Sequence, residues 1–322
     1  MQKFALWSNY KHSDIIASMI SRYTHKGLTW VDVQSPTQEE VRALSEEFNI
    51  HPLAADELLA PTLRPKVDLY PNFIYLILHF PTISHKHDGG HDQEVDFIIG
   101  KDFLITTHYG LIDPLHEFSK VFEVNSILDR GNMGEHAGFL LYYILKEFYK
   151  MLDTELDHIN RDFIDIQSKI FSGKERSMVT AISQLNRDLL NFKQAVRPHK
   201  EVLESFELAG TKFFGEEFSY YLRTIIGEYF KVSSVLDGHR ETILELRDTN
   251  DSLLTTKSND IMKTLTIITF SMLPASLIVG IFGMNTTNTP LSADPNGFWI
   301  ILGVITVTVG STYFFFKSRK WM

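Results

Sequence analysis

Residues 264–293 read TLTIITFSMLPASLIVGIFGMNTTNTPLSA, and residues 295–316 read PNGFWIILGVITVTVGSTYFFF. Neither stretch contains Asp, Glu, Lys or Arg, and they are 30 and 22 residues long. An apolar stretch of about 20 residues is long enough to cross a bilayer as a helix. The chain is therefore predicted to be a membrane protein with two spans near its C-terminal end.

Basic residues flank the two spans and predict their orientation. Five of them lie on the side away from the connecting turn: Lys257, Lys263, Lys317, Arg319 and Lys320. The turn itself, residues 283–297, has no Lys or Arg. Since basic residues near spans remain in the cytoplasm, both termini are predicted to be cytoplasmic and the turn to lie outside.

The turn begins with the triplet Gly283-Met284-Asn285. This triplet, placed between two C-terminal spans after a long soluble region, is the signature of the CorA-type divalent-cation transporters, and the chain resembles that family. The resemblance extends to HPL at 51–53 and RPKV at 64–67, and to MKTLTII at 262–268. It implies a CorA-like fold in the cell (inner) membrane: an α+β cytoplasmic domain, long stalk helices and two C-terminal transmembrane helices.

Three segments are predicted along the chain. Residues 1–130 form the cytoplasmic α/β domain, residues 131–262 the helical stalk region with a long helix from about 215, and residues 263–322 the two-span transmembrane domain. The apolar pattern predicts strands at 30–33, 73–80, 95–99 and 103–107, of which the last two form a hairpin. It also predicts helices at about 136–171, 175–207 and 215–282.

Single residues predict where these helices begin and end. Ser35 is expected to be the N-cap of a helix that runs to about Phe48, with Gln38 closing a capping box. Gly173 and Gly210 are expected to mark breaks between the long helices, and Pro198 to kink or end the second of them.

Composition limits the possible functions. The chain has no cysteine, which excludes disulfides and thiolate metal ligands. Its net charge of −9 argues against nucleic acid as a partner and is compatible with cations. No nucleophile–base pattern, phosphate-binding loop or nucleotide motif occurs, so neither enzymatic activity nor a bound cofactor is expected.

Two rows of residues at seven-residue spacing run along the long helix. The first polar row is Glu241, Asp248, Thr255, Met262, Thr269, Ser276 and Gly283; the second is Glu245, Ser252, Asn259, Thr266, Leu273 and Gly280. Polar residues in a span face protein or water, so these rows indicate a water-filled axis. One helix cannot enclose a pore, which predicts a ring of subunits; the resemblance implies five. The alternative is that the hydroxyls only bond back to the preceding turn.

Members of these rows have individual expected roles. The predicted pore-lining residues are Asp248, Thr255, Asn259, Met262, Thr269, Leu273 and Ser276. Met262 and Leu273 are expected to be hydrophobic constrictions, with plain helix packing as the alternative for Leu273. Glu241, Glu245 and Asp248 are expected to form an acidic vestibule at the inner mouth; alternatively they are a solvated face paired with nearby arginines.

Asn285 is the predicted selectivity residue, with Gly283 and Met284 beside it at the pore entrance. A ring of Asn285 amides would bind the first-shell waters of Mg²⁺, an ion that loses its waters reluctantly. The alternative is a helix C-cap, since Gly and Asn accept left-handed dihedrals. The resemblance also implies a gate that senses cytoplasmic Mg²⁺.

The transported ion can be predicted in a second way, as zinc instead of magnesium. Many magnesium transporters of the family have an acidic residue just after the triplet, whereas here no acid precedes Asp294. A zinc transporter on the same fold, with or without proton coupling, is therefore the second hypothesis, and Co²⁺ and Ni²⁺ are further candidate ions. His85, His87 and His91 suit zinc, although such a loop is also typical of a polar hairpin tip. A third hypothesis is a membrane-anchored scaffold with a coiled-coil stalk, which the polar rows disfavour.

Overall fold

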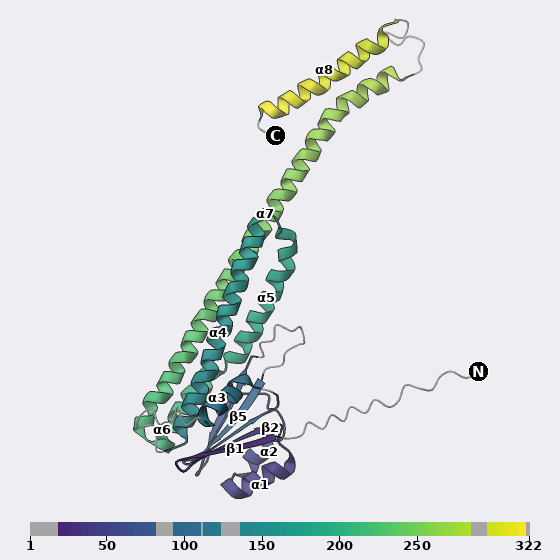
Figure 1. The fold of residues 1–322 in the computed structure, drawn as a ribbon. Coiled ribbons are helices and arrows are strands. Elements are labelled where there is room, and N and C mark those ends of the chain that lie inside the picture. Colours follow the sequence, from purple (N-terminus) through teal and green to yellow (C-terminus); the bar gives the residue numbers. More distant parts are fainter. Residues whose placement is uncertain (1–18, 82–92, 111, 124–135, 285–294, 320–322) are drawn as a thin grey trace, which may run out of the picture. The chain divides into compact units, whose positions relative to one another are not determined.

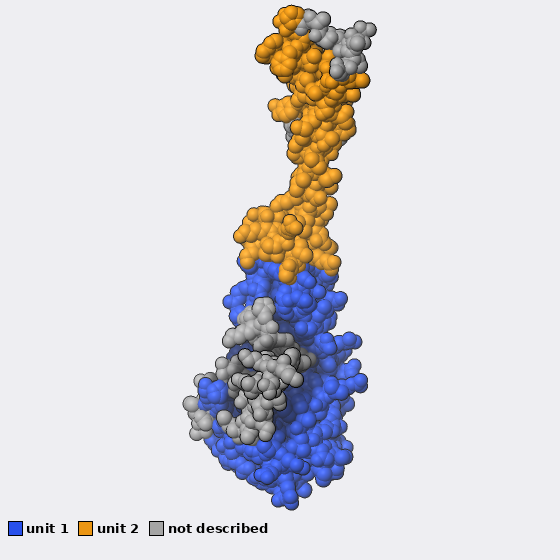
Figure 2. All heavy atoms as spheres, turned by 90° about the vertical axis from the view of Figure 1, so that its right-hand side faces the viewer, with its two compact units in different colours: residues 1–166, 181–244 blue, residues 167–180, 245–322 orange. Residues whose placement is uncertain are grey.

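The computed structural model describes residues 19–81, 93–110, 112–123, 136–284 and 295–319. The chain forms two compact units (Figure 2). Unit 1 comprises residues 1–166 and 181–244, and unit 2 comprises residues 167–180 and 245–322.

A mixed six-stranded sheet forms the centre of unit 1 (Figure 1). Its strands are β1 (Met19–His25), β2 (Leu28–Gln34), β3 (Lys66–Leu69), β4 (Ile74–Phe80), β5 (Gln93–Ile99) and β6 (Phe103–His108), in the order β1-β2-β6-β5-β4-β3. Only β2 and β6 pair in parallel among these strands; the other neighbours are antiparallel. The hairpin predicted around Gly100 is confirmed as β5 and β6.

Helices cover both faces of this sheet, which explains why its strands are buried. On one face, α1 (Gln38–Phe48) and α2 (Pro52–Glu57) pack on the sheet through Val41 and Ala54. The other face carries α3 (Asp113–Glu123), α4 (Gly138–Phe171) and α6 (His199–Phe214). There the ring centroids of Phe80 and Phe148 lie 4.2 Å apart.

A buried histidine links this second face of the sheet to the helices. His199 Nε2 lies 2.8 Å from the carbonyl oxygen of His79 on β4, and Nδ1 lies 2.8 Å from the hydroxyl of Tyr149 on α4. The carbonyl can only accept, so Nε2 carries the proton and Nδ1 accepts from Tyr149. Burial lowers the pKa of His199 to about 4, which keeps the ring neutral.

The expected N-cap of α1 is wrong by two residues. Thr37 is the N-cap: its hydroxyl accepts from the amide of Glu40 at 3.4 Å, and its own amide donates to the Glu40 carboxylate at 2.9 Å. Ser35 instead has φ +51° and donates its hydroxyl to Tyr109 O. The sequence contains two overlapping capping boxes, and the one closed by Glu40 forms because a carboxylate near a helix N-terminus is also favoured by the helix dipole.

This cap gives a first prediction. Replacing Thr37 with Ala should cost about 1 kcal/mol, so the α1 amides should exchange hydrogen roughly fivefold faster. Hydrogen–deuterium exchange on the full chain measures this directly. The control is Ser35→Ala, which should leave α1 exchange unchanged; the opposite ranking of the two variants would contradict the observed cap.

The long helices follow the sequence prediction closely. They are α4, α5 (Glu175–Val196), α6, α7 (Ser219–Phe282) and α8 (Gly297–Ser318), with a short 3-10 turn at Glu216–Phe218. The predicted break at Gly173 is confirmed with φ +91°, and the helix that begins at Glu175 ends just before Pro198. The last two helices are long and apolar enough to cross a membrane, and their apolar parts are almost wholly exposed in the chain.

The break expected at Gly210 is wrong. Gly210 lies inside α6, where a Cβ atom would come within 2.6 Å of Leu222 Cδ1. A larger residue at this position would require the Leu222 side chain of α7 to move, so Gly210 contributes to the packing of α6 against α7. The chain turns instead at Gly215, whose φ of +103° is open to glycine at little cost.

One side of α7 is buried within the chain. The buried residues, called the buried row below, are Leu222, Ile225, Tyr229, Val232, Leu236, Ile243 and Leu246. They follow one another at alternating spacings of three and four residues, and the half-buried His239 fills the position between Leu236 and Ile243. In unit 1, α7 is joined to α4 by Lys231 and Asp153 at 2.6 Å and to α5 by Lys193 and Asp237 at 2.5 Å. Such heptad spacing is typical of a helix packed along its length against other helices.

Candidate ion pathway

The two polar rows lie on the side of α7 opposite the buried row. Glu241 falls two residues before Ile243 and two after His239, which places it about 200° around the helix from each. All seven members of the first polar row are exposed in the chain, and those of the second row are exposed except for the half-buried Thr266. Contacts within the chain therefore use one side of α7 and leave both rows uncovered.

Two hydroxyls of the rows bond back to the helix, as the alternative interpretation expected. Thr266 Oγ1 donates to Met262 O at 2.8 Å, and Thr269 Oγ1 donates to Leu265 O at 2.9 Å. These bonds use the hydroxyl hydrogen and leave oxygen lone pairs free to accept. These two hydroxyls can thus be satisfied in a span and still accept hydrogen bonds from the waters of a hydrated cation.

The acidic residues of the rows are exposed and available to cations. Within the described ranges, none of Glu241, Glu245 and Asp248 forms an ion pair. The nearby Arg247 lies instead 4.0 Å from Asp251. Three carboxylates without basic partners produce a negative potential along this part of α7.

Hydrophobic residues interrupt the rows at two heights. Met262 and Leu273 are 58% and 59% exposed in the chain. Large apolar side chains that remain more than half exposed in the chain are suited to contact identical side chains around an axis, where they would exclude water.

Gly283 and Met284 end the first span, while Asn285 lies outside the described residues. The Gly283 amide donates to Val279 O at 2.8 Å, and a Cβ at this position would lie 2.9 Å from the same oxygen. Gly283 is not in the left-handed region, so the C-cap interpretation does not describe it. His85, His87 and His91 also lie outside the described residues.

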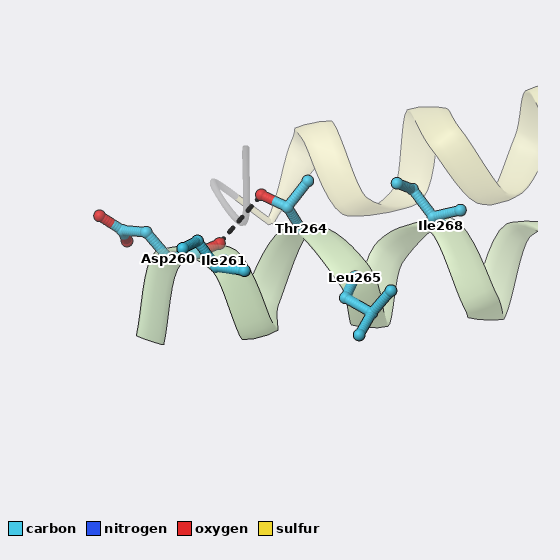
Figure 3. A pocket seen from close by; sticks show the side chains of 5 residues that line it. All are labelled: Asp260, Ile261, Thr264, Leu265 and Ile268. Atoms are coloured by element: carbon cyan, nitrogen blue, oxygen red, sulfur yellow. Dashed lines mark hydrogen bonds between the residues drawn. The ribbon is translucent and has the colours of Figure 1, made fainter. Parts of the chain in front are cut away.

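A shallow hollow on α7 includes none of the residues of the polar rows. It has a volume of about 390 Å³ and is lined by Asp260, Ile261, Thr264, Leu265 and Ile268 (Figure 3). Asp260 and Thr264 continue the heptad positions of the buried row, and Thr264 Oγ1 donates to Asp260 O at 2.9 Å. The hollow therefore belongs to the opposite side of the helix from the candidate pathway.

Comparison with known proteins decides the family. Residues 25–318 match the family described as CorA-like Mg2+ transporter protein. The chain belongs to this family. The cobalt/magnesium transport protein CorA of Thermotoga maritima is 24% identical over 295 residues, which cover 91% of this chain and 83% of that protein. The sequence resemblance is thus confirmed, and the chain is a divalent-cation transporter of the CorA family.

Solved structures confirm the CorA-like fold class. The complete structure of the CorA magnesium transporter from Methanocaldococcus jannaschii matches with a TM-score of 0.80 at 23% identity, covering 93% of each chain. The cytoplasmic domain of ZntB from Vibrio parahaemolyticus matches with a TM-score of 0.58 at 13% identity, covering 71% of this chain and 88% of that one. The α/β soluble region, the long helix and the two C-terminal helices are therefore shared with the complete CorA structure.

The chain also contains a contact that the sequence did not predict. The Lys257 ammonium lies 2.7 Å from the Glu175 carboxylate and 3.4 Å from Gly173 O, in the turn between α4 and α5. Asn250 and Lys257 continue the buried row at seven-residue spacing, and Asn250 is only 1% exposed. The change from apolar to polar residues along this row was the sequence signal from which a polar contact at Lys257 could have been predicted. Among the described residues, no group of three His, Asp or Glu is suited to bind a metal.

Proposed function

We propose that the chain is one subunit of a homo-oligomeric, pentameric channel that moves hydrated Mg²⁺ into the cytoplasm. The two polar rows face the shared axis, a ring of Asn285 amides forms the outer mouth, and Glu241, Glu245 and Asp248 form the inner acidic vestibule. Both termini lie in the cytoplasm, and cytoplasmic Mg²⁺ closes the gate.

The observation that supports this proposal most strongly is the division of α7 into two sides. The chain uses the buried row for its own packing and leaves both polar rows exposed. In a cyclic oligomer equivalent residues lie at equal height, so each exposed residue becomes a ring. Rings of hydroxyl, amide and carboxylate oxygens can bind the water shell of Mg²⁺ without stripping it.

The path of the ion follows from the order of these rings. Asn285 binds the hydrated ion at the outer mouth. Leu273 and Met262 determine whether water fills the pore at their heights, and the acidic vestibule attracts the ion at the inner end. The membrane potential drives a divalent ion inward with about 4.6 kcal/mol per 100 mV. Amide oxygens at the outer ring bind weakly enough for the ion to leave.

Cysteine crosslinking tests the shared axis. Because the chain has no cysteine, Asp248→Cys and Thr255→Cys each introduce a single reactive site. Both variants should form disulfide-linked dimers between subunits under mild oxidation, since facing rows lie near the axis. Val235→Cys is the control, because Val235 belongs to neither row and lies about 140° around the helix from Asp248. Equal crosslinking at all three positions would contradict the proposed register.

Uptake by purified protein in liposomes tests the ion. Mg²⁺ influx should exceed that of Zn²⁺, Co²⁺ and Ni²⁺ at equal concentrations. Zinc is the second candidate because the turn lacks an acid before Asp294 and because the ZntB domain shares the fold. Faster Zn²⁺ influx, or influx that depends on a proton gradient, would favour that candidate over a magnesium channel.

A further inference from the structure

The turn between α4 and α5 belongs to unit 2, together with both spans. It is built by two bonds that satisfy the end of α4: Gly173 N donates to Ile170 O, and Lys174 N donates to Lys169 O. Lys257 of α7 then holds the turn through Glu175, whose side chain is only 6% exposed. Figure 1 shows the turn beside α7, at the ends of α4 and α5 that are nearer the spans. The turn between α4 and α5 therefore lies beside Lys257 of α7.

This position lies next to the lipid headgroups. Lys257 precedes Thr264, the first residue of the uncharged stretch, by seven residues. At 1.5 Å per residue this is about 10 Å along the helix. The headgroup layer on each side of the hydrocarbon core is roughly 5–8 Å thick. The turn therefore lies at or just below the headgroups when the first span is inserted.

The chemistry of the turn suits that layer. Phe171 is 66% exposed at the end of α4, and Lys174 and Arg176 are exposed on either side of Glu175. In the part of the chain that the structure describes, neither Lys174 nor Arg176 forms an ion pair. An exposed aromatic ring with adjacent cations is typical of a surface that contacts the membrane interface.

The segments near the turn carry a net positive charge, whereas the whole chain is negative. The segments 167–180, 257–263 and 317–319 contain seven basic and two acidic residues, whereas the chain has a net charge of −9. The basic residues are Lys169, Lys174, Arg176, Lys257, Lys263, Lys317 and Arg319, and the acidic residues are Glu175 and Asp260. Basic clusters next to spans attract anionic lipids.

We propose that the turn formed by residues 171–176 binds the phosphate groups of anionic lipids in the cytoplasmic leaflet, through Lys174 and Arg176, with Phe171 at the interface. The proposal rests on the membrane orientation within the proposed function, but not on which ion is carried. Since Glu175 and Lys257 fix the turn to α7, lipid bound there contacts a segment attached directly to the helix that lines the candidate pathway.

A single label measures this contact in the full-length protein. Ser172→Cys carries a fluorophore, and the protein is reconstituted in phosphatidylcholine vesicles with increasing phosphatidylglycerol and a lipid bearing a headgroup quencher. Quenching should increase with phosphatidylglycerol. In Lys174→Ser/Arg176→Ser, the apparent equilibrium for lipid contact should weaken roughly 30-fold, from about 1 kcal/mol per basic residue.

Controls separate this contact from general membrane effects. Lys146→Ser/Lys212→Ser removes the same charge from exposed lysines of α4 and α6 and should leave quenching unchanged. A label at Ser183, eleven residues beyond Ser172 and within α5, should be quenched much less. Quenching independent of phosphatidylglycerol or of Lys174 and Arg176, or abolished by millimolar inorganic phosphate, would overturn the proposal. None of these measurements depends on transport, so a failure here is distinct from a failure of the proposed function.

Discussion

Asn285→Ala is expected to reduce Mg²⁺ uptake into proteoliposomes to the level of empty vesicles, with the oligomer and its membrane insertion intact. In a ring, one substitution removes the side-chain oxygen from every subunit at once. Mg²⁺ keeps its water shell and needs an array of acceptors around it. Uptake followed with a Mg²⁺-sensitive dye, beside size-exclusion chromatography of the same sample, measures both properties.

Two further substitutions at this position separate selectivity from turn geometry. Asn285→Asp should impair Mg²⁺ flux and change selectivity, because a ring of carboxylates binds divalent ions more strongly and releases them more slowly. Asn285→Gly keeps all backbone conformations open but removes the amide. If Asn285→Gly transported Mg²⁺ normally, the side chain would have no role in selectivity and the residue would serve only the turn.

His199→Ala is expected to lower the free energy of unfolding of the soluble region by about 3–5 kcal/mol. The substitution leaves the buried Tyr149 hydroxyl without its partner, at roughly 1–3 kcal/mol, removes the hydrogen bond to the His79 carbonyl and also opens a cavity. Both groups lie 2.8 Å from His199 nitrogens in the native chain. Urea unfolding followed by far-UV circular dichroism measures the loss.

The same residue predicts a pH dependence with a definite sign. His199 has a folded-state pKa of about 4, and an unfolded histidine has a pKa of about 6.5. Between these values the unfolded chain binds more protons, so stability is complete above pH 6.5 and is lost as the pH falls towards 4. The loss from this residue is about 3 kcal/mol.

A conservative variant tests the origin of this dependence. His199→Gln retains a donor and an acceptor but does not titrate, so its stability should fall less than that of the native chain between pH 6.5 and 4.5. His136, whose pKa burial also lowers to about 4, should retain part of the slope. An unchanged slope in His199→Gln would show that His199 is not the titrating group.

Features set by local sequence were predictable. The spans follow from uncharged length alone, and the Gly173 break follows from a residue that adopts a positive φ. The buried strand β4 was recognised by its continuous apolar run. By contrast, β1 was missed because Met19–His25 contains charged and polar residues at an edge of the sheet, where one side of the strand needs no apolar cover.

Features set by distant contacts could not be predicted. The partners of His199 lie 50 and 120 residues away along the chain, and no periodic pattern links them. Gly210 looks like a helix break in sequence, but it is explained by the approach of Leu222. Likewise, Ser35 and Thr37 match the same capping pattern, and only the three-dimensional path of the chain after β2 decides between them.

The seven-residue periodicity of the candidate pathway was recognised from the sequence, but the packing of the opposite side of α7 was not. The polar rows were recognised from seven-residue spacing, whereas the buried row on the opposite side of α7 was not. Both the polar rows and the buried row repeat every seven residues within one helix. Their residues are therefore interleaved in the sequence, and the two patterns are difficult to separate there. Exposure in the folded chain separates them, because Ile243 is 1% exposed whereas Glu241 and Asp248 are exposed.

The two-sided construction of α7 has a consequence for how such a protein can evolve. Residues that maintain the fold of one subunit and residues that would contact the passing ion share a helix but not a face. Substitutions in the polar rows can therefore accumulate without unfolding the subunit. A lineage could change the ion it carries by drift along one face, while the other keeps the architecture constant across proteins that share only a quarter of their residues.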